Sequence, residues 1–231
     1  MIALTGDIHG EIDIRKLKQR SKFCNFTKED HLIICGDFGL VWDNSKNDLW
    51  WREWLAQMPY ITLFVDGNHE NFDLLNEFPE EEWHGGRVHR ISDSIIHLMR
   101  GQIFEIDGKT FFTMGGAESH DKEYRKEGKS WWAGELPTLE EYTEAQHNLE
   151  QHGNKVDYIL THCVPTTIQK EMISRLWDHT YQQNELTDFL EWVWQTVSFE
   201  KWYCGHYHMD ITSLTEPRLR VLFDDIIGLG R

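Results

Sequence analysis

Five short segments, each directly after an apolar run rich in β-branched or aromatic residues, carry side chains that bind metal ions. Ligands of open α/β sheets collect beyond the carboxyl ends of the strands, so these five segments can converge in one cleft. The requirement that five strand ends meet restricts the chain to an α/β fold. The segments are Gly6-Asp7-Ile8-His9-Gly10, Gly36-Asp37-Phe38-Gly39, Gly67-Asn68-His69-Glu70, Thr161-His162-Cys163 and Gly205-His206-Tyr207-His208.

Strand-like and helix-like segments alternate in the first and last parts of the chain, whereas the middle runs from strand to strand. This order predicts a layered α/β sandwich in which two mixed sheets lie face to face and helices cover the outside. No repeat, low-complexity tract or linker is visible, so we expect residues 1–231 to form a single domain. The expected strands are Met1–Thr5, His31–Cys35, Tyr60–Val65, Ser94–Met99, Gln102–Ile106, Thr110–Met114, Val156–Thr161, Lys201–Cys204 and a hairpin of Ile211–Thr215 with Leu219–Phe223. The expected helices are Ile14–Arg20, Asp48–Gln57, Leu139–His152 (N-capped by Thr138) and Glu185–Val197.

The ligand types and their spacing indicate two metal ions. Asp7 and His9 are two residues apart, as are His206 and His208, so each pair points to one side of an extended segment. Two carboxylates, one amide and four imidazoles are too many ligands for one ion, but they suit two ions that share a bridging carboxylate. Oxygen and imidazole ligands without a thiolate cluster favour Mn or Fe, with Zn, Ni or Mg as alternatives. A single Gly-Asp pair is usually a turn and a lone histidine is usually no ligand, so the prediction depends on all five segments together.

The motifs GDIHG, GDFG, GNHE, a single histidine after a strand, and GHYH resemble those of the calcineurin-like metallophosphoesterases. The resemblance spans Asp7 to His208 and implies a four-layer α/β/β/α sandwich with a dinuclear metal centre at the strand ends. It implies hydrolysis of a phosphate mono- or diester by a metal-bridging hydroxide, and the chain looks like a small bacterial or phage-type member. His69 would be the catalytic residue, either as general acid or as a group that stabilises the transition state. The family pattern would place Asp7, His9 and His208 on the first metal, Asn68, His162 and His206 on the second, and Asp37 between them.

The chain departs from the protein Ser/Thr phosphatases of this family, which hold phosphate with two arginines. Asp66 stands where those enzymes have an arginine before GNHE, and no Asp-Arg-Gly follows the second aspartate motif. The long segment Gly115–Pro137 breaks the periodicity and supplies Arg125, whose planar bidentate donors suit a phosphate. Arg125 is therefore the candidate substrate-binding residue. The alternative is a solvated basic face of the loop.

Tryptophans adjoin these segments and have more than one interpretation. Trp131-Trp132 either pins its loop to the body of the protein or stacks on a nucleobase. Trp50 and Trp54 are four residues apart, which predicts a core stripe on a helix. Trp42 and Trp51 are candidates for the rim of the cleft.

The formal charge of −16, from 39 acidic and 23 basic residues, makes the surface repel a phosphate backbone. We therefore expect no broad nucleic-acid binding. A small phosphorylated substrate is still expected, because a metal cluster can reverse the sign of the charge inside one cleft.

The first residues suit a strand better than a signal peptide, no apolar run is long enough for a membrane span, and the four cysteines include no CxxC pair. These features predict a reduced, cytoplasmic protein without membrane contact.

Two other hypotheses for the function are a non-catalytic scaffold of the same fold and a nuclease-type member acting on nucleic-acid ends. The physiological substrate, the native metal pair and the oligomeric state stay open.

Overall fold

The first of two mixed sheets holds three of the five predicted ligand segments at its strand ends. A computed structural model describes residues 1–176, 181–213 and 216–229. Two predictions lie outside these ranges. The sequence favours a polar loop at Asp178-His179, with a position at the edge of the cleft as the alternative, and the last residues of the expected strand Ile211–Thr215 are also outside. The strand order in this sheet is β13-β1-β2-β3-β6-β5-β4, and β1, β2, β3 and β6 run parallel. The strands are β1 (Ile2–Thr5), β2 (His31–Cys35), β3 (Ile61–Val65), β4 (Glu80–Trp83), β5 (Gly86–Ser92), β6 (Ile95–Leu98) and β13 (Ile227–Gly228).

The second sheet holds the other two ligand segments, again after parallel strands. Its order is β11-β12-β10-β9-β8-β7, and β8, β9, β10 and β12 run parallel. The expected C-terminal hairpin is confirmed, because β11 pairs antiparallel with β12. The strands are β7 (Ile103–Ile106), β8 (Lys109–Met114), β9 (Tyr158–Thr161), β10 (Lys201–Cys204), β11 (Ile211–Thr212) and β12 (Leu219–Val221).

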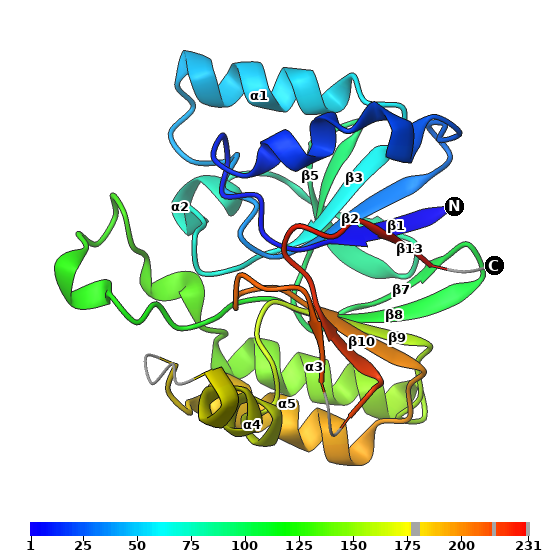
Figure 1. Cartoon of the computed structure of the whole chain (residues 1–231). Helices are drawn as coiled ribbons and strands as arrows, with labels where there is room; N and C mark the ends of the chain where they lie inside the picture. The colour runs from blue at the N-terminus through cyan, green and yellow to red at the C-terminus, as the bar shows by residue number, and fades with distance from the viewer. Residues whose placement is uncertain (177–180, 214–215, 230–231) are drawn as a thin grey trace.

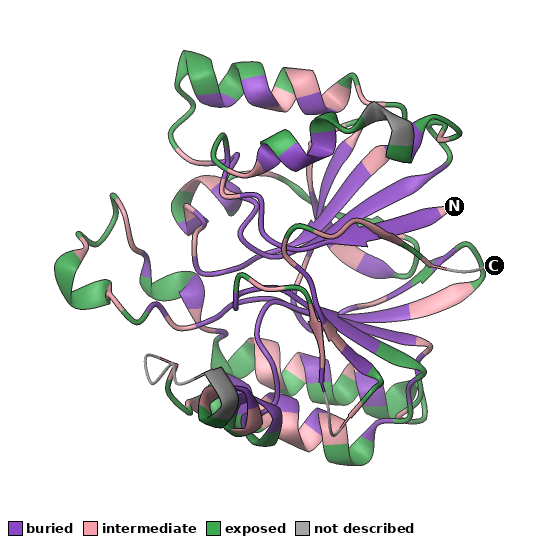
Figure 2. Ribbon diagram, in the orientation of Figure 1, coloured by how far each residue is buried: buried purple, intermediate pink, exposed green. Residues whose placement is uncertain are grey.

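Helices cover the outer face of each sheet and complete four layers (Figure 1). Helix α1 and the N-terminal 3-10 turns lie over the first sheet, and α3, α4 and α5 lie over the second. A third group of apolar residues fills the space between the sheets, where Leu63 of β3 and Leu160 of β9 are fully buried (Figure 2). The predicted α/β/β/α sandwich is therefore confirmed. The helices are α1 (Lys46–Ala56), α2 (Phe72–Leu75), α3 (Leu139–Gln151), α4 (Thr166–Leu176) and α5 (Glu185–Thr196), with 3-10 helices at Ile14–Lys18, Arg20–Phe23, Lys122–Tyr124 and Ala133–Glu135.

Some local predictions are wrong for identifiable reasons. The expected helix Ile14–Arg20 is a 3-10 helix that ends at Lys18, and the side chain of Lys16 leaves it to bind backbone carbonyls. Strand β4 was missed because its sequence, EEEW, has low strand propensity, which suits an exposed edge position. By contrast, Thr138 forms the predicted N-cap of α3 as part of a capping box with Glu141.

The loop Gly115–Pro137 projects from the body as the green segment at the left of Figure 1. Trp132 anchors its base: the side chain is 5% exposed, and its Nε1 donates to Asp73 at 2.8 Å. Its ring also meets Trp42 edge to face at 5.1 Å. This geometry confirms pinning for Trp132. The predicted core position of Trp50 is wrong, because its side chain is 52% exposed.

Two further observations concern the cysteines and possible membrane-spanning helices. Cys35, Cys163 and Cys204 are buried free thiols, as expected, and Cys24 is exposed. Within the described ranges, no helix combines the length and apolar character needed to cross a membrane.

Candidate metal centre

The carboxyl ends of β1, β2, β3, β9 and β10 bring all seven predicted ligands to one place. At its centre, one ligand atom from each of four residues lies within 4.8 Å of the others. These residues are Asp7, His9, Asp37 and His208. Strands β1, β2 and β3 belong to the first sheet and β9 and β10 to the second, so both sheets contribute ligands.

Asp37 occupies the middle of the cluster, where the family pattern would put the bridging ligand. Its Oδ2 lies 3.1 Å from Nε2 of His9, and its Oδ1 lies 3.2 Å from Nε2 of His162. The carboxylate is 1% exposed, and its Oδ1 also accepts the backbone N–H of His69 at 2.8 Å. One carboxylate thus faces a histidine of each predicted metal group.

Asn68, His162 and His206 form the other half of the cluster. Oδ1 of Asn68 lies 3.3 Å from Nε2 of His162, and the rings of His162 and His206 are 4.9 Å apart. Nδ2 of Asn68 donates to Ser119 at 3.1 Å, which turns the amide oxygen towards the cluster. An oxygen, rather than the amide nitrogen, is therefore available to a cation.

Outer hydrogen bonds fix two of the imidazoles. Nδ1 of His162 donates to the carbonyl of Cys35 at 2.9 Å, and Nδ1 of His9 bonds Asp13 at 2.8 Å. Both histidines thus present Nε2 to the centre, as is usual for metal-binding imidazoles. Sequence reasoning missed Asp13, although its position four residues after His9 is a usable signal.

Two further buried ionisable residues, Glu70 and Lys16, support the ligand loops and were also missed. Both oxygens of Glu70 accept backbone N–H groups, from Phe38 at 2.7 Å and from Gly39 at 3.0 Å, and so hold the loop that carries Asp37. Nζ of Lys16 donates to the carbonyl of Asp7 at 2.6 Å beneath the site. Glu70 is part of the GNHE motif, whereas the sequence around Lys16 gives no signal.

The ligand loops have a strained backbone. Four of the seven predicted ligands have positive φ: His9 (40°), Asp37 (46°), His206 (71°) and His208 (47°). Such conformations are costly for residues with a Cβ, and in proteins they cluster at functional sites. Glycines adjoin the loops for a related reason, since a Cβ on Gly205 would lie 2.1 Å from Oδ1 of Asp7. Strand ends therefore approach too closely here for any side chain larger than hydrogen.

The electrostatics of the cluster match a cation site. Burial raises the pKa of Asp7. Burial would lower the pKa of His9 and His162, but the adjacent carboxylates raise both to about 9. The two buried carboxylates thus favour positive charge on the imidazoles beside them. A divalent cation would supply the same charge and release the protons, so the donor set fits metal ions.

Arg125 lies against the ring of His69. Its Nη1 is 3.0 Å from Nδ1 of His69, and Nη2 is 3.4 Å from Nε2. Asp121 accepts from Nε of Arg125 at 2.7 Å, and the carbonyl of Ser130 accepts from Nη1 at 3.2 Å. Burial lowers the pKa of His69 to about 4, and Arg125 contributes to the lowering, so the imidazole is neutral. Arginine only donates and its shorter contact is with Nδ1, which favours Nδ1 as the acceptor and Nε2 as the protonated nitrogen.

Asp66 forms a buried ion pair with Arg100. It is 1% exposed and binds Arg100 through two contacts, at 2.6 and 2.9 Å, with His97 at 3.1 Å. Although burial alone would raise it, the pKa of Asp66 is held below its ordinary value by Arg100 and His97. Arg100 therefore holds a carboxylate behind the site and does not replace the arginines that other branches use for phosphate.

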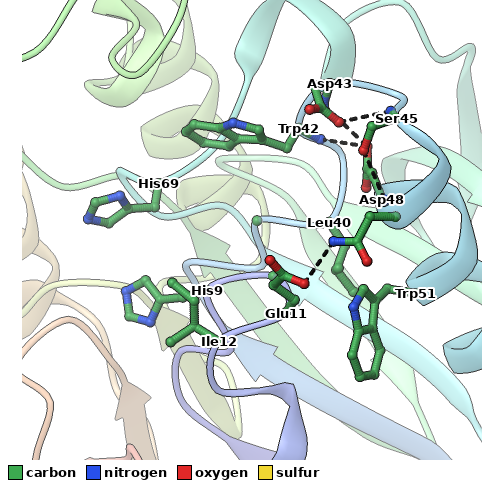
Figure 3. Close-up of a pocket in the computed structure, with 13 residues that line it drawn as sticks. His9, Glu11, Ile12, Leu40, Trp42, Asp43, Ser45, Asp48, Trp51 and His69 are labelled. Carbon is green, nitrogen blue, oxygen red and sulfur yellow. Dashed lines mark hydrogen bonds between the residues drawn. The ribbon is translucent and has the colours of Figure 1, made fainter.

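Two cavities flank the cluster. One, here called the Trp42 pocket, has a volume of about 380 Å³ and is bounded by His9, His69, Ile12, Trp42 and Trp51 (Figure 3). The other has a volume of about 240 Å³ and is lined by residues that include Ser119, His120 and His206. Both Trp42 and Trp51 line the first cavity, but Trp51 is 8% exposed and belongs to the core under the first sheet, so the predicted rim position holds for Trp42 and is wrong for Trp51.

A four-layer sandwich with carboxylates and imidazoles gathered at the strand ends defines a metallophosphoesterase type of protein. The calcineurin-like phosphoesterase family matches residues 1–210. The chain therefore belongs to the calcineurin-like phosphoesterase family, in agreement with the resemblance of its motifs.

Similar proteins include two lariat debranching enzymes. That of Arabidopsis thaliana is 31% identical over 97 residues, which cover 36% of this chain and 23% of the plant protein. Lariat debranching enzyme A of Xenopus laevis is 27% identical over 145 residues, which cover 54% of this chain and 25% of that protein. The chain thus spans about a quarter of the length of these relatives. A solved structure from Staphylococcus aureus, described as a 5'-nucleotidase, has a TM-score of 0.48 at 12% identity and covers 96% of this chain and 48% of its own.

Proposed function

We propose that this protein is a dinuclear metal-dependent phosphoesterase that hydrolyses a phosphate mono- or diester. The observation that carries the proposal is the position of Asp37, whose two oxygens face His9 and His162 from opposite groups of ligands. A carboxylate shared between two sets of donors suits a pair of cations in an in-line displacement at phosphorus. In the reaction, an oxygen from water bonds to phosphorus, the bond to the leaving oxygen breaks, and that oxygen gains a proton.

Asp7, His9 and His208 would hold one ion, Asn68, His162 and His206 the other, and Asp37 both. The bound ions would polarise a phosphoryl oxygen and lower the pKa of water, which makes hydroxide available near neutral pH. Mn or Fe is proposed from the oxygen and imidazole donors, with Zn, Ni or Mg as alternatives.

His69 and Arg125 are proposed to act on the ester itself. Arg125 is free to exchange its bond to His69 for a bond to phosphate oxygens, because Asp121 and Ser130 hold the guanidinium at the edge of the site. His69 then lies beside the leaving oxygen, to which it donates a hydrogen bond or a proton. Neither residue is needed to hold a metal in this arrangement.

The test is a substrate panel with Mn-loaded protein. It contains a nitrophenyl monoester, the corresponding bis diester, cyclic nucleotides and a dinucleoside polyphosphate. Turnover of at least one of them, lost on chelation and restored by metal, is the expected result. Full metal occupancy without turnover of any of them would favour the non-catalytic scaffold.

A nuclease-type activity is the second candidate, because the two curated relatives are named as lariat debranching enzymes. The charge of −16 favours a small phosphorylated substrate instead. A salt titration of single-stranded oligonucleotide binding separates the two: a steep loss of affinity with salt would support the nuclease. A cytoplasmic location and the absence of membrane contact are proposed on the same compositional grounds as above.

A further inference from the structure

We propose that the Trp42 pocket receives the leaving group of the ester, and that this group is an uncharged aromatic moiety with hydrogen-bond donors, such as a nucleoside. The inference rests on the proposed function and names its substrate class. Four properties carry it: position, shape, rigidity and charge.

The position of the pocket follows from His9, which belongs to both the metal cluster and the cavity lining, and from His69, which lines the cavity with its ring 5.2 Å from that of His9. In Figure 3 the two histidines stand at one end and Trp51 at the other. A phosphate at the metal cluster with its leaving oxygen at His69 would direct the group attached to that oxygen into this space. The volume of about 380 Å³ lies within the range of small-molecule sites.

The shape of the pocket suits a flat ring. Trp42 and Ile12 lie on different sides of it, with Leu40 and Trp51 farther in (Figure 3). Ile12 is 71% exposed, so its side chain offers apolar surface that the protein itself does not cover. Aromatic platforms bind bases of any kind by stacking.

Trp42 is held in place by several contacts, so it forms a preformed wall of the pocket. Its backbone N–H donates to Asp48, its carbonyl accepts from Asn71, and its ring packs on Trp132. Asp48 also accepts from the next two backbone N–H groups, which fixes the whole turn before α1. A preformed aromatic wall binds a ring with little loss of conformational entropy.

The charge of the pocket excludes a second phosphate. Its lining includes the carboxylates of Glu11, Asp43 and Asp48, and no lysine or arginine among the described residues. Asp48 is offset by Arg52 at 3.4 Å and by backbone donors. Glu11 and Asp43 stand at exposed positions, where Glu11 accepts from the amide of Asn47 and Asp43 from the backbone N–H of Ser45, both uncharged donors. These two carboxylates would accept hydrogen bonds from amino or hydroxyl groups and repel a phosphorylated leaving group. A polynucleotide chain on this side is therefore disfavoured.

Three compounds that each carry a phosphate on the 5-hydroxyl of ribose test the proposal with Mn-loaded protein: ribose 5-phosphate, adenosine 5'-monophosphate and adenosine 3',5'-bisphosphate. Release of the 5'-phosphate is measured in each case. We expect kcat/KM to rise roughly 5- to 150-fold from the first to the second, which is the contribution of one stacked base. We expect it to fall about fivefold or more from the second to the third at low salt. If the protein hydrolyses only diesters, the same three compounds with a methyl ester on the 5'-phosphate are used instead. Equal rates for the first two, or a bisphosphate as good as the monophosphate, would overturn the proposal.

Variants connect these preferences to the pocket. Trp42→Ala should bring the first ratio towards one, and Trp42→Phe should largely keep it. Trp192→Ala, a matched change at a tryptophan of α5 outside the pocket, should leave the ratio as in the wild type. Glu11→Gln with Asp43→Asn should reduce the penalty on the bisphosphate. A ratio that survives Trp42→Ala would place the base elsewhere.

Adenosine binding, measured by calorimetry against ribose, separates this inference from the proposed function. Adenosine binding that is lost in Trp42→Ala supports the pocket even if no ester is hydrolysed. Hydrolysis without adenosine binding supports the phosphoesterase and rejects the pocket.

Discussion

At the scale of single residues, the site separates groups that can hold metal from groups that can act on the ester. The ring of His69 is T-shaped to that of His9 at 5.2 Å, yet its nearest polar side chain is that of Arg125. Its backbone N–H, by contrast, holds Asp37. A substitution of the side chain therefore leaves the bond from the backbone of His69 to Asp37 intact. This separation makes two substitutions informative.

His69→Ala should keep metal content and lose turnover by roughly 10²- to 10⁴-fold, the usual size of an acid–base contribution. Metal analysis and steady-state kinetics on the same preparation measure both quantities. If metal is lost together with activity, His69 is a ligand or a structural residue.

Arg125→Ala should lower kcat/KM roughly 10- to 150-fold, because a charge-assisted hydrogen bond contributes about 1.5–3 kcal/mol. The metal content should not change. Lys126→Ala, next to it on the same loop, is the matched control and should behave as the wild type. Wild-type kinetics in Arg125→Ala would leave the solvated loop face as the better interpretation.

At the scale of elements, the strand ends were predictable and their supports were not. Apolar runs that end in Gly-Asp, Gly-Asn or Gly-His identify β1, β2, β3 and β10, because a buried parallel strand needs a continuous apolar sequence. Asp13 and Ser119 come from a turn and a loop and Lys16 from a short 3-10 helix, and their approach to the ligands depends on tertiary packing. Strand β4 likewise forms through pairing with β5, against the preference of its glutamates. Sequence patterns therefore predict which elements carry the chemistry better than which residues support it.

The pair Asp66–Arg100 joins four elements behind the metal centre. Asp66 follows β3 and Arg100 follows β6, while Arg100 also reaches Glu141 of α3 and the carbonyl of Gly134 in the long loop. Asp66→Ala should lower the free energy of unfolding by about 3–5 kcal/mol, since it leaves a buried guanidinium without its partner. Urea unfolding measures the loss. The double variant Asp66→Ala with Arg100→Met should be less destabilised than the single one; equal losses would mean that the buried charge is not the cause.

At the scale of the whole molecule, two carboxylates of this acidic protein are buried at one site, where they favour the binding of cations. Asp7 and Asp37 lie at the junction of both sheets, and their nearest compensation is a group of imidazoles. Cations that bind there would connect loops from both halves of the sandwich. Metal binding should therefore stabilise the entire fold and not one loop alone.

Addition of Mn²⁺ at about 100 times its dissociation constant should stabilise the folded state by about 2.7 kcal/mol. For a chain of 231 residues this corresponds to a rise in Tm of roughly 5–11 °C. Calorimetry with and without a chelator measures the shift, which should disappear in Asp37→Asn because that variant loses the charge shared by both groups of ligands. His147→Ala removes an exposed histidine of α3 and controls for adventitious binding, so it should keep the full shift. A shift of the same size in Asp37→Asn would place the stabilising metal outside the cluster, and the strained ligand loops would then need another explanation.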